Sequence, residues 1–101
     1  MHADNLLIRA VDASDAAAAS ALVQESFLKL AAGAWESQAR QQFLAESGPA
    51  ALEHKIVAAA YAVGAFTDSQ MVGFLLMRTP TLLGMLFVDP RLLRRGIATR
   101  L

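Results

Sequence analysis

The chain has 101 residues, of which 55% are apolar and 18% are charged, so it can form one small domain and is too apolar to be disordered. It contains no cysteine, which excludes disulfides and a thiol nucleophile, and its formal net charge is zero. We expect a single domain over residues 1–101. A nucleic-acid partner is not expected, because such proteins carry a broad basic field.

The N-terminal stretch MHADNLLIRA lacks the basic and apolar regions of a signal peptide. The longest uninterrupted apolar run, Ile56–Phe66, is shorter than the ~20 residues that span a bilayer. These features predict a cytoplasmic protein without a membrane partner.

A short β-rich segment, residues 5–11, predicts the first strand. Asp12 and Ser14 then compete as the N-cap of an amphipathic helix that begins at Ala16. Apolar residues recur at helical spacing as far as Gly33, where this helix is expected to end.

Residues 34–47 repeat the helical period and predict a second helix with a polar outer face. Pro49 can be the first residue of a third, short helix that continues to Ala58. Because the following residues are rich in alanine, the boundary between this helix and the next strand stays open.

Three apolar segments follow, with β-branched and aromatic residues, at residues 60–66, 71–78 and 81–88. Short turns separate them, at Thr67–Gln70 and Thr79–Thr81, and connections this short require antiparallel neighbours. All three segments are apolar on both sides, which predicts that both faces of the sheet are covered.

Positive charge gathers at the C-terminal end of the sequence. Residues 1–90 hold five Lys or Arg against nine acids, whereas residues 91–101 hold four arginines and no acid. The last strand should give way there to a helix, whose first N–H groups lack partners and favour a phosphate. The P-loop pattern and the dinucleotide-binding glycine pattern are both absent.

The segment LFVDPRLLRRGIATRL resembles the acetyl-CoA-binding motif of the GCN5-related N-acetyltransferases (GNAT). In that family the last strand before the motif ends with the consecutive pattern aliphatic–aromatic–Val–x–Pro, in which x is any residue. A loop with a glycine and then a glycine or alanine two positions later opens the next helix. Gly96, Ile97 and Ala98 match this loop, and a proline stands six residues before the glycine. Leu93 departs from it, because the family usually has glutamine or arginine there.

The resemblance implies an α/β (α+β) fold: a strand, two or three helices, an antiparallel meander and the start of a further helix. It covers about two-thirds of the usual fold, with the next strand and helix beyond Leu101, so the domain is expected to be incomplete. The resemblance also implies acetyl-CoA as cosubstrate, no metal, and a small-molecule or peptide amine as acceptor, which attacks the thioester directly.

The resemblance further implies the cofactor-binding residues. Backbone groups of Phe87 and Val88 would pair with the pantetheine arm. The pyrophosphate would be held by N–H groups of the loop, which are those of Arg94, Arg95, Gly96, Ile97, Ala98 and Thr99. Gly84 would lie near the thioester.

No catalytic residue is assigned. Glu25 and Glu36 are weak candidates for the general base, and Tyr61 lies in the wrong strand for the general acid, which belongs to a helix beyond Leu101. Phe27, Trp35 and Phe43 could line an acceptor pocket, but apolar residues at this spacing are more often core. His54 is expected to be a solvated helix position, and with only His2 beside it a metal site is not expected.

A second interpretation comes from another functional class. The chain could be a non-catalytic module that binds CoA or pairs with a partner chain. A homodimer through an exposed sheet edge is one form of such pairing.

Overall fold

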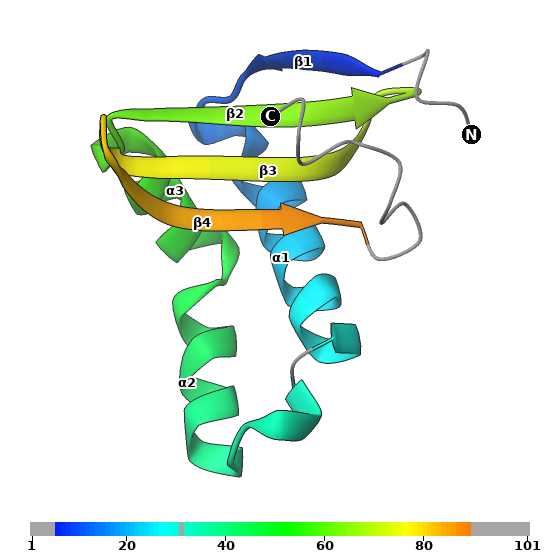
Figure 1. Cartoon of the computed structure of the whole chain (residues 1–101), viewed down its shortest axis with the longest axis vertical. Coiled ribbons are helices and arrows are strands. Elements are labelled where there is room, and N and C mark those ends of the chain that lie inside the picture. Colours follow the sequence, from blue (N-terminus) through cyan, green and yellow to red (C-terminus); the bar gives the residue numbers. More distant parts are fainter. Residues whose placement is uncertain (1–5, 31, 90–101) are drawn as a thin grey trace.

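The computed structural model describes residues 6–30 and 32–89, which form an antiparallel sheet with helices packed against it (Figure 1). The strands lie in the order β1-β2-β3-β4, which is also their order in the chain. Their bounds are β1 Leu7–Ala10, β2 Tyr61–Thr67, β3 Gln70–Thr79 and β4 Leu82–Val88. The predicted α/β class and the antiparallel meander are therefore confirmed.

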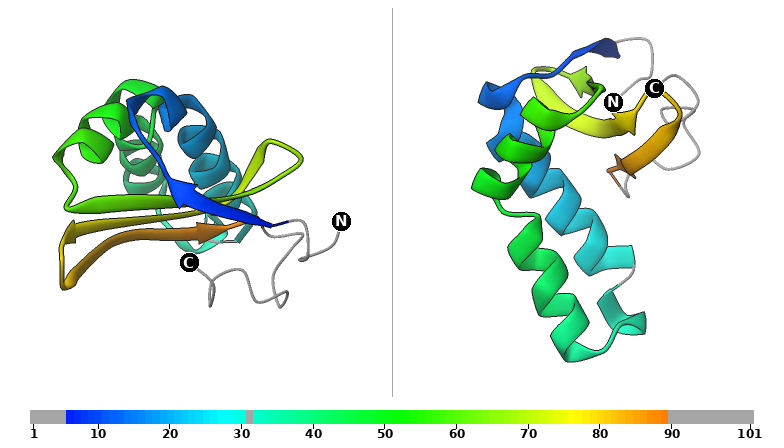
Figure 2. Two further views of the ribbon diagram at one scale, coloured as in Figure 1. Left: turned by 90° about the horizontal axis from the view of Figure 1, so that it is seen from above. Right: turned by 90° about the vertical axis from the view of Figure 1, so that its left-hand side faces the viewer.

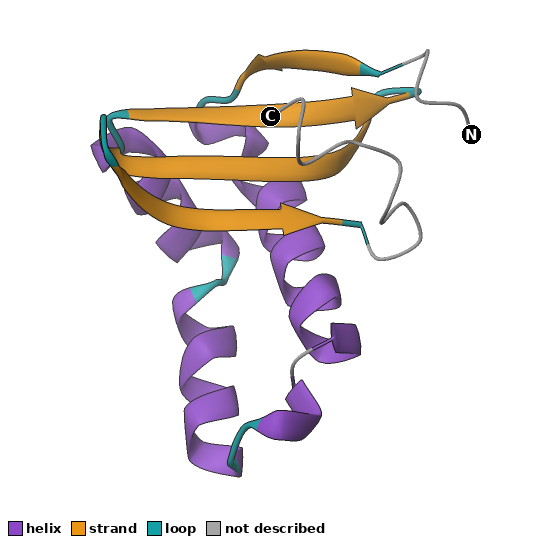
Figure 3. Cartoon of the chain, in the orientation of Figure 1, coloured by secondary structure: helices purple, strands orange, loops and turns teal. Residues whose placement is uncertain are grey.

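The helices occupy the segment between β1 and β2 (Figure 3). Their bounds are α1 Ala16–Leu30, α2 Ser37–Glu46 and α3 Pro49–Ala58, with short 3₁₀ turns at Ala13–Asp15 and Ala32–Ala34. Pro49 occupies the first turn of α3, as predicted. The helix expected to reach Gly33 ends at Leu30, and a 3₁₀ turn contains the glycine instead.

Asp12 is the residue that caps the entry into α1, through the 3₁₀ turn that precedes it. Its carboxylate accepts the N–H of Ser14 at 2.9 Å, and the carboxylate of Asp15 accepts the N–H of Asp12 at 3.0 Å. This reciprocal pair is a capping box, so Asp12 rather than Ser14 is the N-cap. Arg9 of β1 forms an ion pair with Asp15 at 3.0 Å and so connects the first strand to the helix start.

The turn between β2 and β3 has the backbone conformation that tight hairpins prefer. Asp68 and Ser69 have φ values of 49° and 67°. Two successive left-handed residues match the right-handed twist of the two strands that they join. Pro80 and Thr81 form the second turn, between β3 and β4.

The main core lies between the sheet and the helices α1 and α3. Its fully buried large side chains include Phe74 of β3, Leu52 of α3 and Val23 of α1. A smaller cluster occupies the other face of the sheet and consists of Ala65, Val72 and Val88, with Leu6 and Ile8 against it. Figure 2 shows that the described helices all lie on one face. The predicted cover of the second face stays a prediction.

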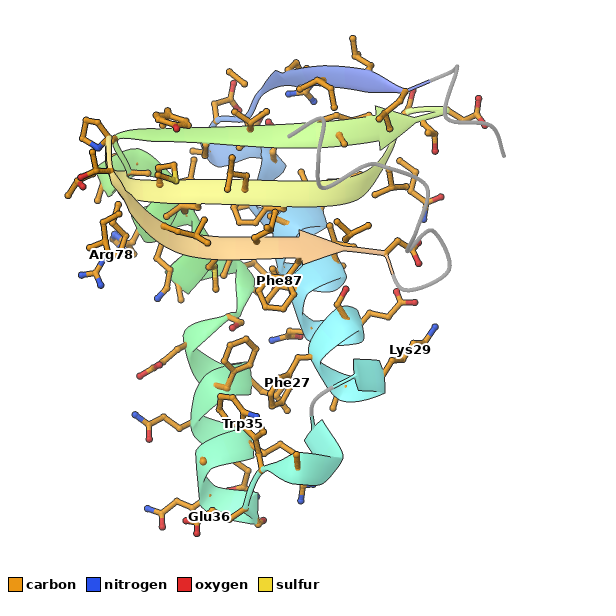
Figure 4. The ribbon with its side chains drawn as sticks, viewed as in Figure 1. Phe27, Lys29, Trp35, Glu36, Arg78 and Phe87 are labelled. Atoms are coloured by element: carbon orange, nitrogen blue, oxygen red, sulfur yellow. The ribbon has the colours of Figure 1, made fainter. Side chains whose placement is uncertain are left out.

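Aromatic side chains hold α2 against α1. None of the side chains of α2 is fully buried, but the ring of Phe43 stacks on that of Phe27 at 4.3 Å between centroids. Trp35 meets the ring of Phe27 edge-on at 4.9 Å, and Phe87 of β4 lies 6.3 Å from Phe43 (Figure 4). The three rings pack against one another. Phe27 is 3% exposed, so the prediction that it belongs to the core is confirmed.

Among residues 6–30 and 32–89, no helix combines the length and the apolar character that crossing a membrane requires.

Candidate functional site

The strand β4 lies at the edge of the described sheet, so one side of its backbone has no neighbouring strand there. Val88 lies opposite Gly73 in β3, and the N–H of the next residue, Asp89, donates to the carbonyl of Val72 at 2.8 Å. In an antiparallel pair the residues that bond to the neighbouring strand alternate with those that face away. The backbone groups of Val88 therefore point away from β3, the N–H toward the free edge of β4, while the carbonyl accepts a hydrogen bond from Ser26 of α1.

The same alternation decides which other residues of β4 face outward. Leu86 shares the orientation of Val88, whereas Phe87 directs its backbone groups toward β3 and its side chain toward the main core. The register therefore favours Leu86 and Val88 for pairing with an extended ligand. The backbone contact of Phe87 with the pantetheine arm stays a prediction. Leu86 is a further candidate for this contact, which the sequence pattern did not indicate.

Ser26 of α1 anchors the end of β4. Its hydroxyl is buried and donates to the carbonyl of Val88 at 3.4 Å. This contact holds the strand at the point from which the arginine-rich segment departs. The remaining predicted cofactor-binding residues, Arg94 to Thr99, lie outside the described residues.

A cavity of about 590 Å³ opens at the other end of β4, between that strand, β3 and α3. Its polar side chains are His54 and Lys55 of α3 and Arg78 of β3. The apolar part consists of Leu76 and Met85. Gly84 of β4, Ala58 of α3 and Ala59, which follows the end of α3, complete the lining. We call this the basic cavity.

Gly84 shapes the basic cavity through its missing side chain. A Cβ at this position would lie 2.8 Å from Cγ of Arg78 and 2.9 Å from Cδ2 of Leu76. Any other residue would displace one of these side chains. The glycine therefore keeps the backbone of β4 accessible beside Arg78.

The expected catalytic carboxylates lie away from the basic cavity. Glu25 forms an ion pair with Lys29 at 3.0 Å on the outer side of α1. Glu36 lies at the end of α2 that is distant from the sheet (Figure 4). Tyr61 pairs with Met77, at the opposite end of the sheet from Val88. Glu36 and Tyr61 therefore lie away from the end of β4 at Val88, whereas Glu25 lines a second cavity together with Asp89, the residue that follows Val88.

The second cavity, of about 380 Å³, lies at the turn between β2 and β3 and is lined by Glu25, Asp68 and Asp89 among others. Within the part of the chain that the structure describes, no three His, Asp or Glu side chains are arranged to bind a metal ion.

Lys55 and Arg78 were not singled out by the sequence, and His54 was expected only to be solvated. These three side chains become neighbours because α3 packs beside the hairpin of β3 and β4. No spacing along the chain signals this proximity, since it arises from tertiary packing.

Solved structures resemble the whole described fold. A PaiA N-acetyltransferase from Thermoplasma acidophilum, in complex with coenzyme A, aligns with a TM-score of 0.81 and 21% identity over 95% of this chain. A GCN5-related N-acetyltransferase from Rhodopseudomonas palustris aligns with a TM-score of 0.78 and 22% identity over 92%. A Brucella melitensis GNAT acetyltransferase in complex with acetyl-CoA aligns with a TM-score of 0.64 and 18% identity over 94%. At these identities the likeness establishes the fold.

The chain spans 66% of the length of the first of these proteins, 58% of the second and 62% of the third. No curated protein sequence matches it. A family model described as the acetyltransferase (GNAT) domain, however, matches residues 14–101, which is most of the chain. The sequence motif, the fold and this match agree, and the chain belongs to the GNAT acetyltransferase family.

Proposed function

We propose that the protein is an acetyl-CoA-dependent N-acetyltransferase that transfers an acetyl group to a primary amine. The observation that carries the proposal is the free edge of β4 at Val88, which continues directly into the arginine-rich segment 91–101. Membership of the GNAT family supports acetyl transfer, and two of the similar structures contain coenzyme A or acetyl-CoA.

In the proposed complex the backbone groups of Leu86 and the N–H of Val88 pair with the pantetheine arm as an added strand would. The N–H groups of Arg94 to Thr99 bind the pyrophosphate, since unpaired N–H groups at a helix start attract anions. A backbone N–H of β4 donates to the thioester carbonyl and stabilises the negative charge that develops on its oxygen.

The acceptor amine forms a bond to the carbonyl carbon after losing a proton to a base or a water chain. Collapse of the tetrahedral intermediate then breaks the carbon–sulfur bond, and the second proton that the nitrogen loses goes to the departing thiolate, so that CoA leaves as its thiol. The acetyl group passes directly to nitrogen without an acyl-enzyme. No residue of this chain is assigned as the base or the acid, and a cytoplasmic location stays a prediction.

The test is a calorimetric titration of the 101-residue chain with acetyl-CoA, with dephospho-CoA as the comparison ligand. We expect saturable binding at one site. Gly96→Asp should abolish it by placing a carboxylate against the pyrophosphate, whereas Arg94→Ala should weaken it less because the contact is through the backbone. Absence of binding in a folded sample, or unchanged affinity of Gly96→Asp, would contradict the proposed donor site.

The non-catalytic alternative is favoured by one observation on β4. Leu82, Leu83 and Leu86 are 51%, 49% and 43% exposed, and they lie on β4, which pairs with β3 on one side and has no neighbouring strand on the other among the described residues. An apolar free edge of this kind can pair with a second chain. Light scattering tests a homodimer: a mass of twice 10.8 kDa that falls to the monomer value in Leu86→Lys would support it. A monomer at every concentration would exclude it.

A further inference from the structure

We propose that the basic cavity binds an anionic group of the acceptor, so that the acceptor is a small amine that also carries a carboxylate or a phosphate. This inference names the substrate class of the proposed function and rests on it. It starts from a cavity that is formed wholly by described residues and that lies apart from the arginine-rich segment.

The charged side chains around the basic cavity are both positive. Lys55 and Arg78 contribute to its lining together with the imidazole of His54, and no carboxylate among the described residues does. Within residues 6–30 and 32–89, Arg9 and Lys29 are paired with acids, whereas Lys55 and Arg78 take part in no such ion pair. Two cations are therefore available to a ligand at this cavity, although the described residues carry more acids than bases.

The side chains are suited to a small acid. The guanidinium group of Arg78 can bind both oxygens of a carboxylate or phosphate, and Lys55 adds a compact positive charge. Met85, beside the almost fully buried Leu76, gives the lining an apolar part that fits a methylene chain. A polyamine without an anionic group would meet repulsion from the same cations.

The position of the cavity relates it to the proposed reaction. Gly84 lines the cavity, and β4 continues from it to Leu86 and Val88, whose N–H groups face the free edge. The family resemblance implies that the thioester lies near Gly84, which is part of the cavity lining. A molecule held by its acid at Arg78 can therefore present an amine at its other end to the proposed thioester.

The experiment follows the two-dimensional amide NMR spectrum of the 101-residue chain during titration with ε-aminocaproate. Hexylamine is the matched ligand, because it keeps the amine and the chain length but lacks the carboxylate. We expect saturable shifts at Lys55, Arg78 and Gly84 with ε-aminocaproate and at least about tenfold weaker binding of hexylamine. A parallel titration with phosphoethanolamine decides whether phosphate is bound in place of carboxylate.

Substitutions assign the binding to the cavity. Arg78→Gln and Lys55→Gln should each weaken ε-aminocaproate binding about three- to tenfold, as expected for loss of one exposed charge contact. Lys29→Gln is the matched control, because Lys29 lies on α1 on the other side of the molecule (Figure 4). Far-ultraviolet circular dichroism verifies that each variant is folded.

Equal affinity for hexylamine, or unchanged affinity in both cavity variants, would overturn the inference. Failure of the proposed function has a different signature. If ε-aminocaproate binds at the cavity but acetyl-CoA does not bind, the anion site stands and the acetyltransferase assignment fails. If acetyl-CoA binds and ε-aminocaproate does not, the donor site stands and this acceptor class is wrong.

Discussion

Ser20 and Ser47 form a buried connection between α1 and the end of α2. The hydroxyl of Ser20 donates to the carbonyl of Ser47 at 2.6 Å, and both residues are almost fully buried. Ser20→Ala leaves that carbonyl without its donor in a place that water does not reach. We expect the free energy of unfolding to fall by about 1–2 kcal/mol, measured by denaturant titration.

Ser47→Ala provides the contrast at the same place. The hydroxyl oxygen of Ser47 is buried and has no hydrogen-bond partner among the described residues. Its removal takes away an unsatisfied polar group and leaves the carbonyl bond to Ser20 intact. Stability should stay the same or rise slightly, and a loss as large as that in Ser20→Ala would contradict this account.

Asp15 predicts a pH dependence of stability. The hydrogen bond from Arg9 is the main cause that lowers the pKa of its carboxyl, and the N–H of Asp12 contributes, although burial opposes the shift. Because the pKa is lower in the folded state, the stabilisation is complete above the unfolded value of about 3.9 and is lost as the pH falls through the folded value. Asp15→Asn should lower the free energy of unfolding at neutral pH by about 0.5–1 kcal/mol, because a carboxylate in the first helical turn is favoured by the helix dipole and its surface ion pair is screened by solvent.

The measurement for Asp15 is thermal unfolding between neutral and strongly acidic pH. The difference between the wild type and Asp15→Asn should shrink as the pH falls below the ordinary carboxyl pKa. Asp12→Asn is the control, because asparagine caps helices as well as aspartate does. A constant difference at every pH would show that the ion pair with Arg9 is not responsible.

Among elements, α2 is the one that depends on few contacts. Phe43 stacks on Phe27, and the amide of Gln24 donates to the carbonyl of Leu44 at 2.8 Å. Phe43→Ala should therefore loosen α2 while the sheet stays folded, at a cost of about 2–3 kcal/mol for a half-buried aromatic side chain. Hydrogen exchange should accelerate in Ser37–Glu46 and change little in β2 and β3.

Gln41→Ala, at an exposed position of the same helix, is the matched control for Phe43→Ala. It should leave hydrogen exchange in α2 nearly unchanged. Acceleration across the whole chain in Phe43→Ala would mean that α2 does not open separately.

The element order was predictable because each element carries its own local signal. Helical spacing of apolar residues and Pro49 indicated α1 to α3, and short polar turns indicated the antiparallel hairpins. The end of α1 was misplaced by a few residues, because the alanine-rich segment before Gly33 is compatible with both an α-helix and a 3₁₀ turn.

Only the part of the candidate site that is contiguous in sequence could be predicted from the sequence. The motif after β4 is contiguous in sequence and could be recognised from its residues. Which side of β4 faces outward depends on the register with β3, and that register contains irregularities at Leu76 and Met77. The basic cavity combines residues of α3, β3 and β4, so it required the packed structure.

For the whole molecule, the distribution of charge predicts how donor binding responds to salt. Residues 1–90 are acidic overall, and residues 91–101 carry four arginines. Attraction between this segment and the phosphates of acetyl-CoA is screened over about 10 Å at 0.1 M salt. We expect the dissociation constant to increase severalfold between about 0.05 M and about 0.5 M sodium chloride, measured by calorimetry.

S-acetylpantetheine is the matched ligand for the salt experiment, because it keeps the thioester and the pantetheine arm but has no phosphate. Its affinity should change little over the same range of salt. Equal salt dependence for both ligands would assign the effect to something other than the arginine-rich segment.

The strand order also determines the sequence of folding events. β2, β3 and β4 are joined by two-residue turns and pair with their immediate neighbours, which is fast because little loop entropy is lost. β1 pairs with β2 only after all the helical residues between Ala10 and Val63 have been brought together. Contacts this distant in sequence raise the contact order and form late. We therefore expect Ile8→Ala in β1 to speed unfolding and to leave the refolding rate nearly unchanged in stopped-flow measurements, so that β1 completes the sheet after the transition state has been crossed.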